Sequence, residues 1–103
     1  MEFMISYRVR ADRVTEHGRL LADVFAELDA LQPDGLRYAV RVLADGRSYV
    51  DMVEGPDIPT ALAALPAFQQ YRAGLEERCE TPISMSELTL VHSHAPDAAG
   101  RTE

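Results

Sequence analysis

The sequence contains one cysteine and no lysine, tryptophan or asparagine. With Cys79 alone, an internal disulfide and a metal cluster held by cysteines are both excluded. No apolar run approaches the ~20 residues of a membrane-spanning helix, and the N-terminus lacks the pattern of a secretory signal. These absences predict a cytoplasmic protein without a membrane partner, and the arginine-rich, lysine-free composition suggests a bacterial source.

The charge of the chain is acidic. Its 10 basic residues, all arginine, are outnumbered by 17 aspartates and glutamates, which gives a formal net charge of -7. Because the arginines are scattered among carboxylates, they form no basic stripe, and we expect no nucleic-acid partner.

The length of 103 residues leaves room for one domain. With 47% hydrophobic and 26% charged residues, the composition is that of an ordinary globular protein. We expect a folded domain over residues 1–94 and a disordered tail over residues 95–103, which are mostly small and polar.

The first third of the chain predicts a strand followed by a long helix. Residues 4–10 (MISYRVR) alternate between apolar and polar side chains, as a half-buried strand does. Asp12 is a candidate N-cap, and Gln32-Pro33-Asp34-Gly35 is expected to end the helix. The positions between them that follow helical spacing and should face inward are Val14, Gly18, Leu21, Val24, Phe25, Leu28 and Leu31.

The middle of the chain predicts a β-hairpin. Two alternating runs, residues 36–43 and 48–54, are joined at Asp45-Gly46, a sequence that favours a two-residue type I′ turn. This turn fixes a register in which Arg37 faces Glu54, an attractive pair of opposite charges. The same register places Tyr38, Val40, Val42, Tyr49, Asp51 and Val53 on one side of the hairpin.

The last third of the chain predicts a second helical stretch and a final strand. Pro66 interrupts the helical pattern of residues 60–79, so we expect a short turn near residues 60–64 and a main helix from residue 66. The inward stripe of that helix is predicted to be Leu65, Phe68, Arg72, Leu75 and Cys79. Residues 84–92 (SMSELTLVH) are predicted to form the last strand.

The resulting order, βαββαβ, predicts an α+β, ferredoxin-like fold with a four-stranded antiparallel sheet and both helices on one face. The other face would carry Ala39, Leu43, Val50 and Met52 beside a few charged residues. That surface is too apolar for free exposure to solvent, so we expect a homodimer in which two sheets pack face to face.

Four segments carry a resemblance to a known family: MISYRVR, the hairpin RVLADGRSYVDMVEG, the helix ALPAFQQYRAGL and the strand SELTLVHSH. In their order and spacing, over about residues 4–94, they resemble the antibiotic biosynthesis monooxygenase superfamily of dimeric α+β barrel proteins. The resemblance implies a homodimer with a pocket between helices and sheet. It also implies membership of a group that includes cofactor-independent oxygenases of polyketide quinols and haem-degrading enzymes.

Three polar residues interrupt otherwise apolar inward stripes, namely His17, Asp51 and Arg72. A functional interpretation is a pocket in which His17 acts as a base, Asp51 orients it and Arg72 holds an anionic oxygen. A structural interpretation is a partly buried Asp51–Arg72 ion pair and a histidine that only completes the core. Tyr38 and Phe68 are the candidate aromatic walls of a substrate pocket.

The remaining candidates favour structural interpretations. His92 and His94 form an H-x-H pair without a third ligand at a fixed spacing, so we expect no metal site there. Cys79 lies on an apolar stripe and is expected to be an inert core thiol. The four tyrosines either line a pocket or fill the core. In the absence of a nucleotide-binding loop or a ligand set, we expect no cofactor.

Two functions remain open from the sequence. One is a cofactor-independent monooxygenase acting on an aromatic or polyketide-like small molecule. The other is a non-catalytic homodimeric module of the same fold that binds a small molecule or has a structural role. A pocket of several hundred Å³ reached by His17 and Arg72 would favour the first, and a pocket closed around an Asp51–Arg72 pair would favour the second.

Overall fold

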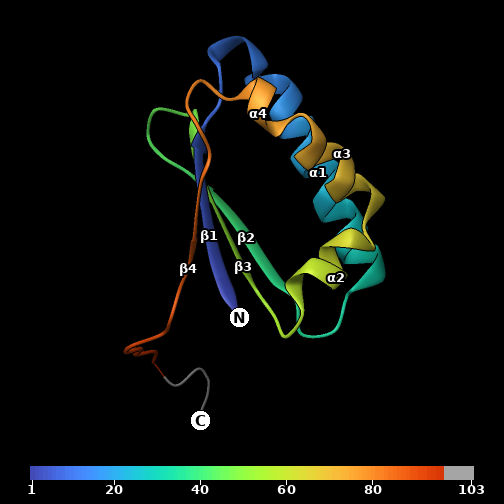
Figure 1. Ribbon diagram of the computed structural model, residues 1–103, viewed down its shortest axis with the longest axis vertical. Helices are drawn as coiled ribbons and strands as arrows, with labels where there is room; N and C mark the ends of the chain where they lie inside the picture. Colours follow the sequence, from blue (N-terminus) through green and yellow to red (C-terminus); the bar gives the residue numbers. More distant parts are fainter. Residues whose placement is uncertain (97–103) are drawn as a thin grey trace.

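A computed structural model describes residues 1–96 of the chain. It is a four-stranded antiparallel sheet, in the strand order β2-β3-β1-β4, with the helices on one face (Figure 1). The elements in chain order are β1 (Glu2–Arg8), the 3-10 helix η1 (Ala11–Arg13), α1 (Val14–Leu31), β2 (Arg37–Val42), β3 (Ser48–Glu54), α2 (Ile58–Ala63), α3 (Pro66–Ala73), α4 (Leu75–Arg78) and β4 (Ser84–Glu87). The predicted α+β, ferredoxin-like fold is confirmed. Every helix among residues 1–96 is too short or too polar to cross a lipid bilayer.

The first strand begins earlier than predicted. Glu2 and Phe3 pair with Glu54 and Val53 of β3, and the N–H of Gly55 donates to the carbonyl of Met1. The residues that precede the second methionine therefore belong to the sheet.

Helix α1 starts without the predicted cap. Asp12 lies inside η1, and Arg13 occupies the N-cap position without a capping side-chain hydrogen bond. The prediction is wrong because the chain makes one 3-10 turn between strand and helix, closed by a bond from Arg13 N–H to the carbonyl of Arg10. The predicted end is confirmed, since Gln32 takes a left-handed conformation and its N–H donates to the carbonyl of Leu28. Leu31 is 59% exposed, so the inward stripe stops one turn earlier than predicted.

The hairpin has the predicted register. Arg37 faces Glu54, Tyr38 faces Val53 and Val40 faces Asp51. The predicted turn type is wrong, because Gly46 has a positive φ of 73° and Asp45 does not. Asp45 acts through its carboxylate instead, which accepts from the backbone N–H groups of Arg47 and Ser48.

The second helical stretch consists of three short helices. Asp57 caps α2, and Pro66 opens α3 as predicted, at a position where a missing N–H costs nothing. The helical stretch is predicted to continue to Cys79, but it is interrupted at Gly74, and α4 starts at Leu75. This break changes which side chains of the last turn face inward.

Strand β4 ends at Glu87, five residues before the predicted end. Its partner β1 starts at Glu2, Phe3 pairs with Glu87, and the N–H of Leu88 donates to the carbonyl of Glu2. Beyond this point β1 has no residues left to pair, so residues 88–96 continue away from the sheet (Figure 1). Of the predicted disordered tail, residues 97–103 lie outside the described part of the chain.

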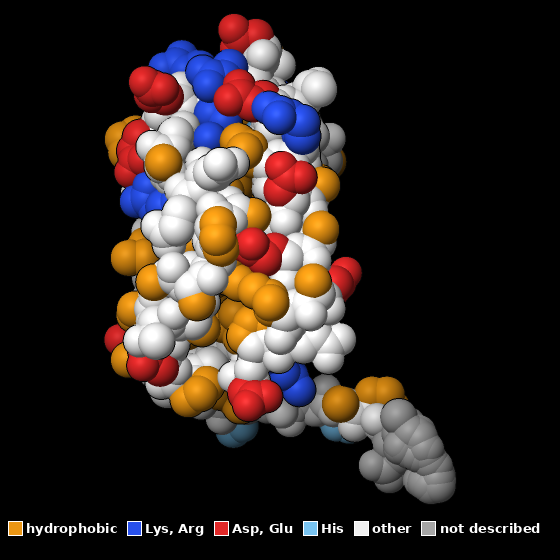
Figure 2. Space-filling model, turned by 90° about the vertical axis from the view of Figure 1, so that its right-hand side faces the viewer, with side chains coloured by type: hydrophobic (Ala, Val, Ile, Leu, Met, Phe, Trp, Pro, Cys, Tyr) orange, Lys and Arg blue, Asp and Glu red, His pale blue; other side chains and the backbone are white. Residues whose placement is uncertain are grey.

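The core lies between the helices and the sheet, where α1 packs against α3. Its buried apolar residues are Tyr7, Val9, Val24, Val53, Ile58, Leu62, Leu65, Phe68, Tyr71, Leu75 and Cys79. Figure 2 shows the helical face, on which charged side chains gather mainly at the end that carries η1 and α4 in Figure 1.

The opposite face of the sheet, here called the back face, is apolar in its centre. Met4, Val50 and Met52 are half-buried there, and Ala39 is exposed. Leu90 and Val91, on the segment that leaves the sheet, are 71% and 78% exposed. Contiguous apolar surface of this kind typically marks a contact with another protein.

We therefore expect a homodimer in which two back faces pack together. Light scattering at micromolar concentration should give twice the 11.4 kDa mass of one chain. Met52→Glu would place a charge in the centre of the contact and should yield monomers. Ala63→Glu, at an exposed position of α2, is the matched control and should remain dimeric. A monomeric mass for the unmodified protein would refute this arrangement.

Candidate functional site

A cluster of buried polar side chains lies between the helices and the sheet. His17 of α1, Asp51 of β3 and Arg78 of α4 are 0%, 1% and 2% exposed. A buried charge is destabilising unless hydrogen bonds compensate for its lost hydration. The partners of these three side chains therefore determine what the cluster can do.

Asp51 is held by three tyrosine hydroxyls from three different elements. Tyr7 of β1 donates to Oδ1 at 2.7 Å, while Tyr71 of α3 and Tyr38 of β2 donate to Oδ2 at 2.5 and 3.1 Å. None of the ion pairs among residues 1–96 includes Asp51. Its carboxylate is thus stabilised by neutral donors, and both of its oxygens have partners.

The surroundings shift the acid–base properties of all four groups. Burial raises the pKa of Asp51, although the three tyrosine hydrogen bonds oppose this shift. Burial and the nearby Asp51 charge raise the pKa of Tyr7, Tyr38 and Tyr71 well above the usual tyrosine range. The hydroxyls therefore remain protonated donors, while Asp51 accepts a proton more readily than an exposed aspartate.

His17 connects this group to Arg78. Its Nε2 lies 3.1 Å from the hydroxyl of Tyr7, and its Nδ1 accepts from Nε of Arg78 at 3.3 Å. Burial, and secondarily the charge of Arg78, lower the pKa of His17 to about 4. The imidazole is therefore neutral at neutral pH, and both of its nitrogens have partners.

Arg78 is the member of the buried cluster that the sequence patterns missed. Besides His17, its guanidinium donates from Nη2 to the carbonyl of Tyr71 at 2.6 Å and lies 5.5 Å from the centre of the Tyr71 ring. The sequence contains one indication of this placement, Gly74, because glycine disfavours a helix interior and so indicates a break within the expected helix. Because α4 restarts after Gly74, Arg78 faces inward.

Arg72 lies elsewhere than predicted. Tyr71, one residue earlier, takes the inward position of α3, and Arg72 is exposed. Nη1 of Arg72 donates to the carboxylate of Glu76 at 2.8 and 2.9 Å. The buried Asp51–Arg72 ion pair of the structural interpretation is therefore wrong.

Asp51 and Arg72 nevertheless line the same cavity, which we call the Asp51 cavity. It has a volume of about 390 Å³ and opens between α3 and the sheet. Its lining residues are Ile5, Asp51, Phe68, Tyr71, Arg72, Leu75, Glu76, Pro82, Ile83 and Met85. Asp51 thus contributes to the wall of this cavity beside apolar and aromatic side chains, while it is itself only 1% exposed.

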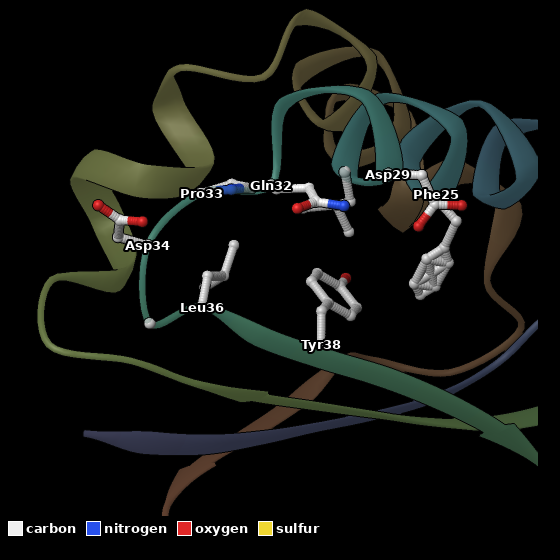
Figure 3. A pocket seen from close by; sticks show the side chains of 9 residues that line it. Phe25, Asp29, Gln32, Pro33, Asp34, Leu36 and Tyr38 are labelled. Carbon is white, nitrogen blue, oxygen red and sulfur yellow. The ribbon is translucent and has the colours of Figure 1, made fainter.

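A second cavity, the Tyr38 cavity, lies beside the C-terminal end of α1. It has a volume of about 420 Å³. Tyr38 projects into it from β2 and Leu36 from the residue before β2, and Phe25 points toward them from α1 (Figure 3). Tyr38 lines this cavity, and its hydroxyl donates a hydrogen bond to Asp51, which lines the other cavity.

The two predicted aromatic walls therefore belong to different cavities. Phe68 lines the Asp51 cavity, Tyr38 lines the Tyr38 cavity, and their ring centres are 6.3 Å apart. His17, the predicted base, lines neither of them. It reaches Asp51 only through the hydroxyl of Tyr7.

The other candidates lie outside the cluster. Cys79 is 3% exposed, and burial raises the pKa of its thiol, as expected for an unreactive core cysteine. His92 and His94 are exposed on the segment that follows β4. Among residues 1–96, no group of three or more His, Cys, Asp or Glu side chains is arranged to hold a metal ion.

The buried imidazole predicts a specific pH dependence of stability. His17 has a folded-state pKa of about 4 against 6.5 for an unperturbed histidine, so between these values the unfolded chain binds more protons. Lowering the pH through this range should reduce the free energy of unfolding by about 3 kcal/mol.

The measurement is urea denaturation of the native protein and of His17→Gln at several pH values from about 7.5 to 4.5. Glutamine offers Tyr7 and Arg78 a donor and an acceptor but does not titrate. The native protein should lose more stability on acidification than His17→Gln does. Because its pKa is raised by folding, Asp51 increases the free energy of unfolding as the pH falls. This contribution is present in both proteins, so it cancels when their pH curves are subtracted. Parallel pH curves for the two proteins would contradict the assignment.

Comparison with known proteins establishes the fold. No protein-family model and no curated protein matches the sequence. Among solved structures, one described as an antibiotic biosynthesis monooxygenase aligns with a TM-score of 0.71 and 14% identity, over 88% of this chain and 98% of its own. Rv0793 from Mycobacterium tuberculosis aligns with a TM-score of 0.66 and 22% identity, over 91% and 97%.

SnoaB from Streptomyces nogalater, described as a cofactor-independent oxygenase, aligns with a TM-score of 0.61 and 21% identity, over 87% of this chain and 93% of its own. At these identities the comparisons concern the backbone and assign no activity. The chain has the fold of crystal structures described as antibiotic biosynthesis monooxygenases, as the four sequence segments indicated.

Proposed function

We propose that the protein is a cofactor-independent monooxygenase acting on an aromatic or polyketide-like small molecule. The observation that carries the proposal is the Asp51 cavity, a space of about 390 Å³ with aromatic walls that is lined by a buried carboxylate of raised pKa. SnoaB, described as a cofactor-independent oxygenase, shares the fold and supports the same reaction class.

The chemistry requires little from the protein. An electron-rich aromatic compound with an acidic C–H or O–H group can itself reduce oxygen once it has become an anion. In an anthrone, a ring CH₂ is oxidised to C=O by one O₂, and the second oxygen atom leaves as water with the two hydrogens. The protein then supplies a base, a partner for the anion and a site sheltered from water.

We assign the base to Asp51 rather than to His17. Asp51 lines the cavity, and burial raises its pKa toward the range in which a carboxylate is an effective base. His17 is fully buried and lines neither cavity, so its nitrogens do not face a substrate bound in the Asp51 cavity. In this proposal, His17 positions Tyr7, and Tyr7 positions Asp51.

Arg72 keeps its predicted role as the partner of the substrate anion. Arg72 is one of the residues that line the Asp51 cavity, and its partner Glu76 is solvent-exposed, so the pair can separate at little cost. Phe68 provides an aromatic wall in the same cavity. Tyr38 acts through its hydrogen bond to Asp51. The proposed enzyme is a cytoplasmic homodimer.

The second candidate is a non-catalytic homodimeric module that binds a small molecule or has a structural role. The observation in its favour is that the Asp51 hydrogen bonds are complete without a ligand, as in a network that only stabilises the core.

Oxygen uptake with a panel of hydroquinones and anthrones distinguishes the two functions. The native protein should accelerate uptake, and Asp51→Asn, which removes the base at constant shape, should lower the rate by about 10²-fold or more. Arg72→Ala should weaken the stabilisation of the anion and lower the rate about 10-fold. Arg19→Met, on the exposed face of α1, is the control and should retain the full rate.

Circular dichroism and thermal melting should accompany each variant, because the amide introduced by Asp51→Asn would face three hydroxyls that must reorient. Absence of uptake by the folded native protein across the panel would favour the binding module. Full activity in folded Asp51→Asn and Arg72→Ala would leave the reaction class standing and reject the site.

The purified protein should also be colourless and free of metal, because the proposed reaction needs neither a flavin, a haem nor a transition metal. A visible absorption spectrum and elemental analysis test this expectation. A stoichiometric chromophore or a tightly bound transition metal would contradict it.

A further inference from the structure

Arg78 and Asp51 are oppositely charged, buried and out of contact, and they are joined by two side chains. Arg78 donates to His17, His17 contacts Tyr7, and Tyr7 donates to Asp51, at 3.3, 3.1 and 2.7 Å. All four side chains are at most 5% exposed. Water therefore has little access to this chain of hydrogen bonds, and each proton in it must have a definite place.

The direction of the chain follows from the chemistry of arginine. A guanidinium has donors and no acceptor, so Nδ1 of His17 must be the unprotonated nitrogen. A neutral imidazole then carries its proton on Nε2 and donates it to the Tyr7 oxygen. The Tyr7 hydroxyl also lies 2.6 Å from that of Tyr71, whose own proton is donated to Oδ2 of Asp51. With its oxygen accepting from His17, Tyr7 directs its own proton to Oδ1 of Asp51.

We propose that Arg78 is a positioning residue for Asp51, acting through the tautomer of His17 and the hydroxyl orientation of Tyr7. Without Arg78, His17 is free to carry its proton on Nδ1 and to accept from Tyr7 through Nε2. The Tyr7 proton would then turn away from Asp51, whose hydrogen bonds would fall from three to two. The inference rests on the proposed role of Asp51 as the base, although its structural part stands without it.

Gly74 supplies an independent indication that the position of Arg78 is constrained. A Cβ atom at residue 74 would lie 3.1 Å from Nη1 of Arg78, closer than ordinary van der Waals contact. The guanidinium has little freedom to yield, because Nε is bonded to His17 and Nη2 to the carbonyl of Tyr71. A glycine at residue 74 leaves the space that this placement needs.

Other ionisable groups could also influence Asp51. Those that face it or line its cavity are Tyr7, Tyr38, Tyr49, Tyr71, Arg72 and Glu76. Among residues 1–96, none of them has a hydrogen bond to Nδ1 of His17, so the tautomer of His17 reports on its hydrogen bond with Arg78.

The first test is the ¹⁵N NMR spectrum of the imidazoles in the full chain near neutral pH. His17 should show one tautomer, protonated on Nε2, in the native protein and in Arg78→Lys, which retains a cationic donor. In Arg78→Met, the Nδ1-protonated form should appear. The exposed His92 and His94 provide internal references, and Arg19→Met should match the native spectrum. An Nδ1-protonated His17 in the native protein, or an unchanged tautomer in Arg78→Met, overturns the proposal.

If Arg78→Met does not fold, Gly74→Ala takes its place. Its added methyl group should displace the guanidinium and produce the second tautomer. Gly18→Ala is the matched control, because a Cβ atom at residue 18 meets nothing within 4 Å. A single Nε2-protonated form in Gly74→Ala would count against the proposal.

The second test uses the pH profile of oxygen uptake. Losing one hydrogen bond to its charged form should make Asp51 easier to protonate, so the acidic limb of kcat/KM should move up by about one pH unit in Arg78→Met. Arg78→Lys should restore the native profile, which a purely structural effect would not require. An unshifted limb in active Arg78→Met overturns the positioning role. An inactive native protein with the expected tautomers rejects the enzyme while keeping the structural part.

Discussion

The rest of the site depends on one constraint, a carboxylate buried without a contact to any cation of residues 1–96. Asp51 is 1% exposed, and its lost hydration is replaced by hydroxyl groups from β1, β2 and α3. No single element could supply these donors, so the sheet and α3 must come together before the carboxylate is satisfied. Leaving a buried acceptor unpaired costs free energy, so packing arrangements that lack one of these donors are disfavoured. The hydrogen bonds therefore select this arrangement as well as stabilise it.

Strand pairing and helix ends could be anticipated from the sequence because they depend on local chemistry. The alternation of residues 36–54 determines the hairpin register, and the register places Asp51 on the same side as Tyr38 and Tyr49. Gln32-Pro33 and Pro66 mark a helix end and a helix start for reasons contained in the residues themselves. The placement of Asp51 on the inward side was for these reasons a sound prediction.

The rest of the site depended on distances between elements. Helical spacing of three or four residues makes Tyr71 and Arg72 equally compatible with the stripe of Phe68 and Leu75, and the break at Gly74 then turns Arg78 inward. The end of β4 depends on where its partner β1 begins. The tyrosine hydrogen bonds depend on how close three elements approach, which periodicity does not specify. The buried arginine therefore went unrecognised.

The hydrogen-bond network also shows how Asp51 could contribute to the stability of the core and still act as the proposed base. A carboxylate held by three neutral donors keeps its charge in the core, yet it lacks the direct cation that would make it a poor base. The compensating charge of Arg78 acts through His17 and Tyr7, and so it orients the donors without neutralising the acceptor. The same separation leaves one side of Asp51 facing the cavity rather than an ion-pair partner. Because Arg78 is separated from Asp51 by two side chains, no cation of residues 1–96 forms an ion pair with the carboxylate, and this is the condition that the proposed role of Asp51 as a base requires.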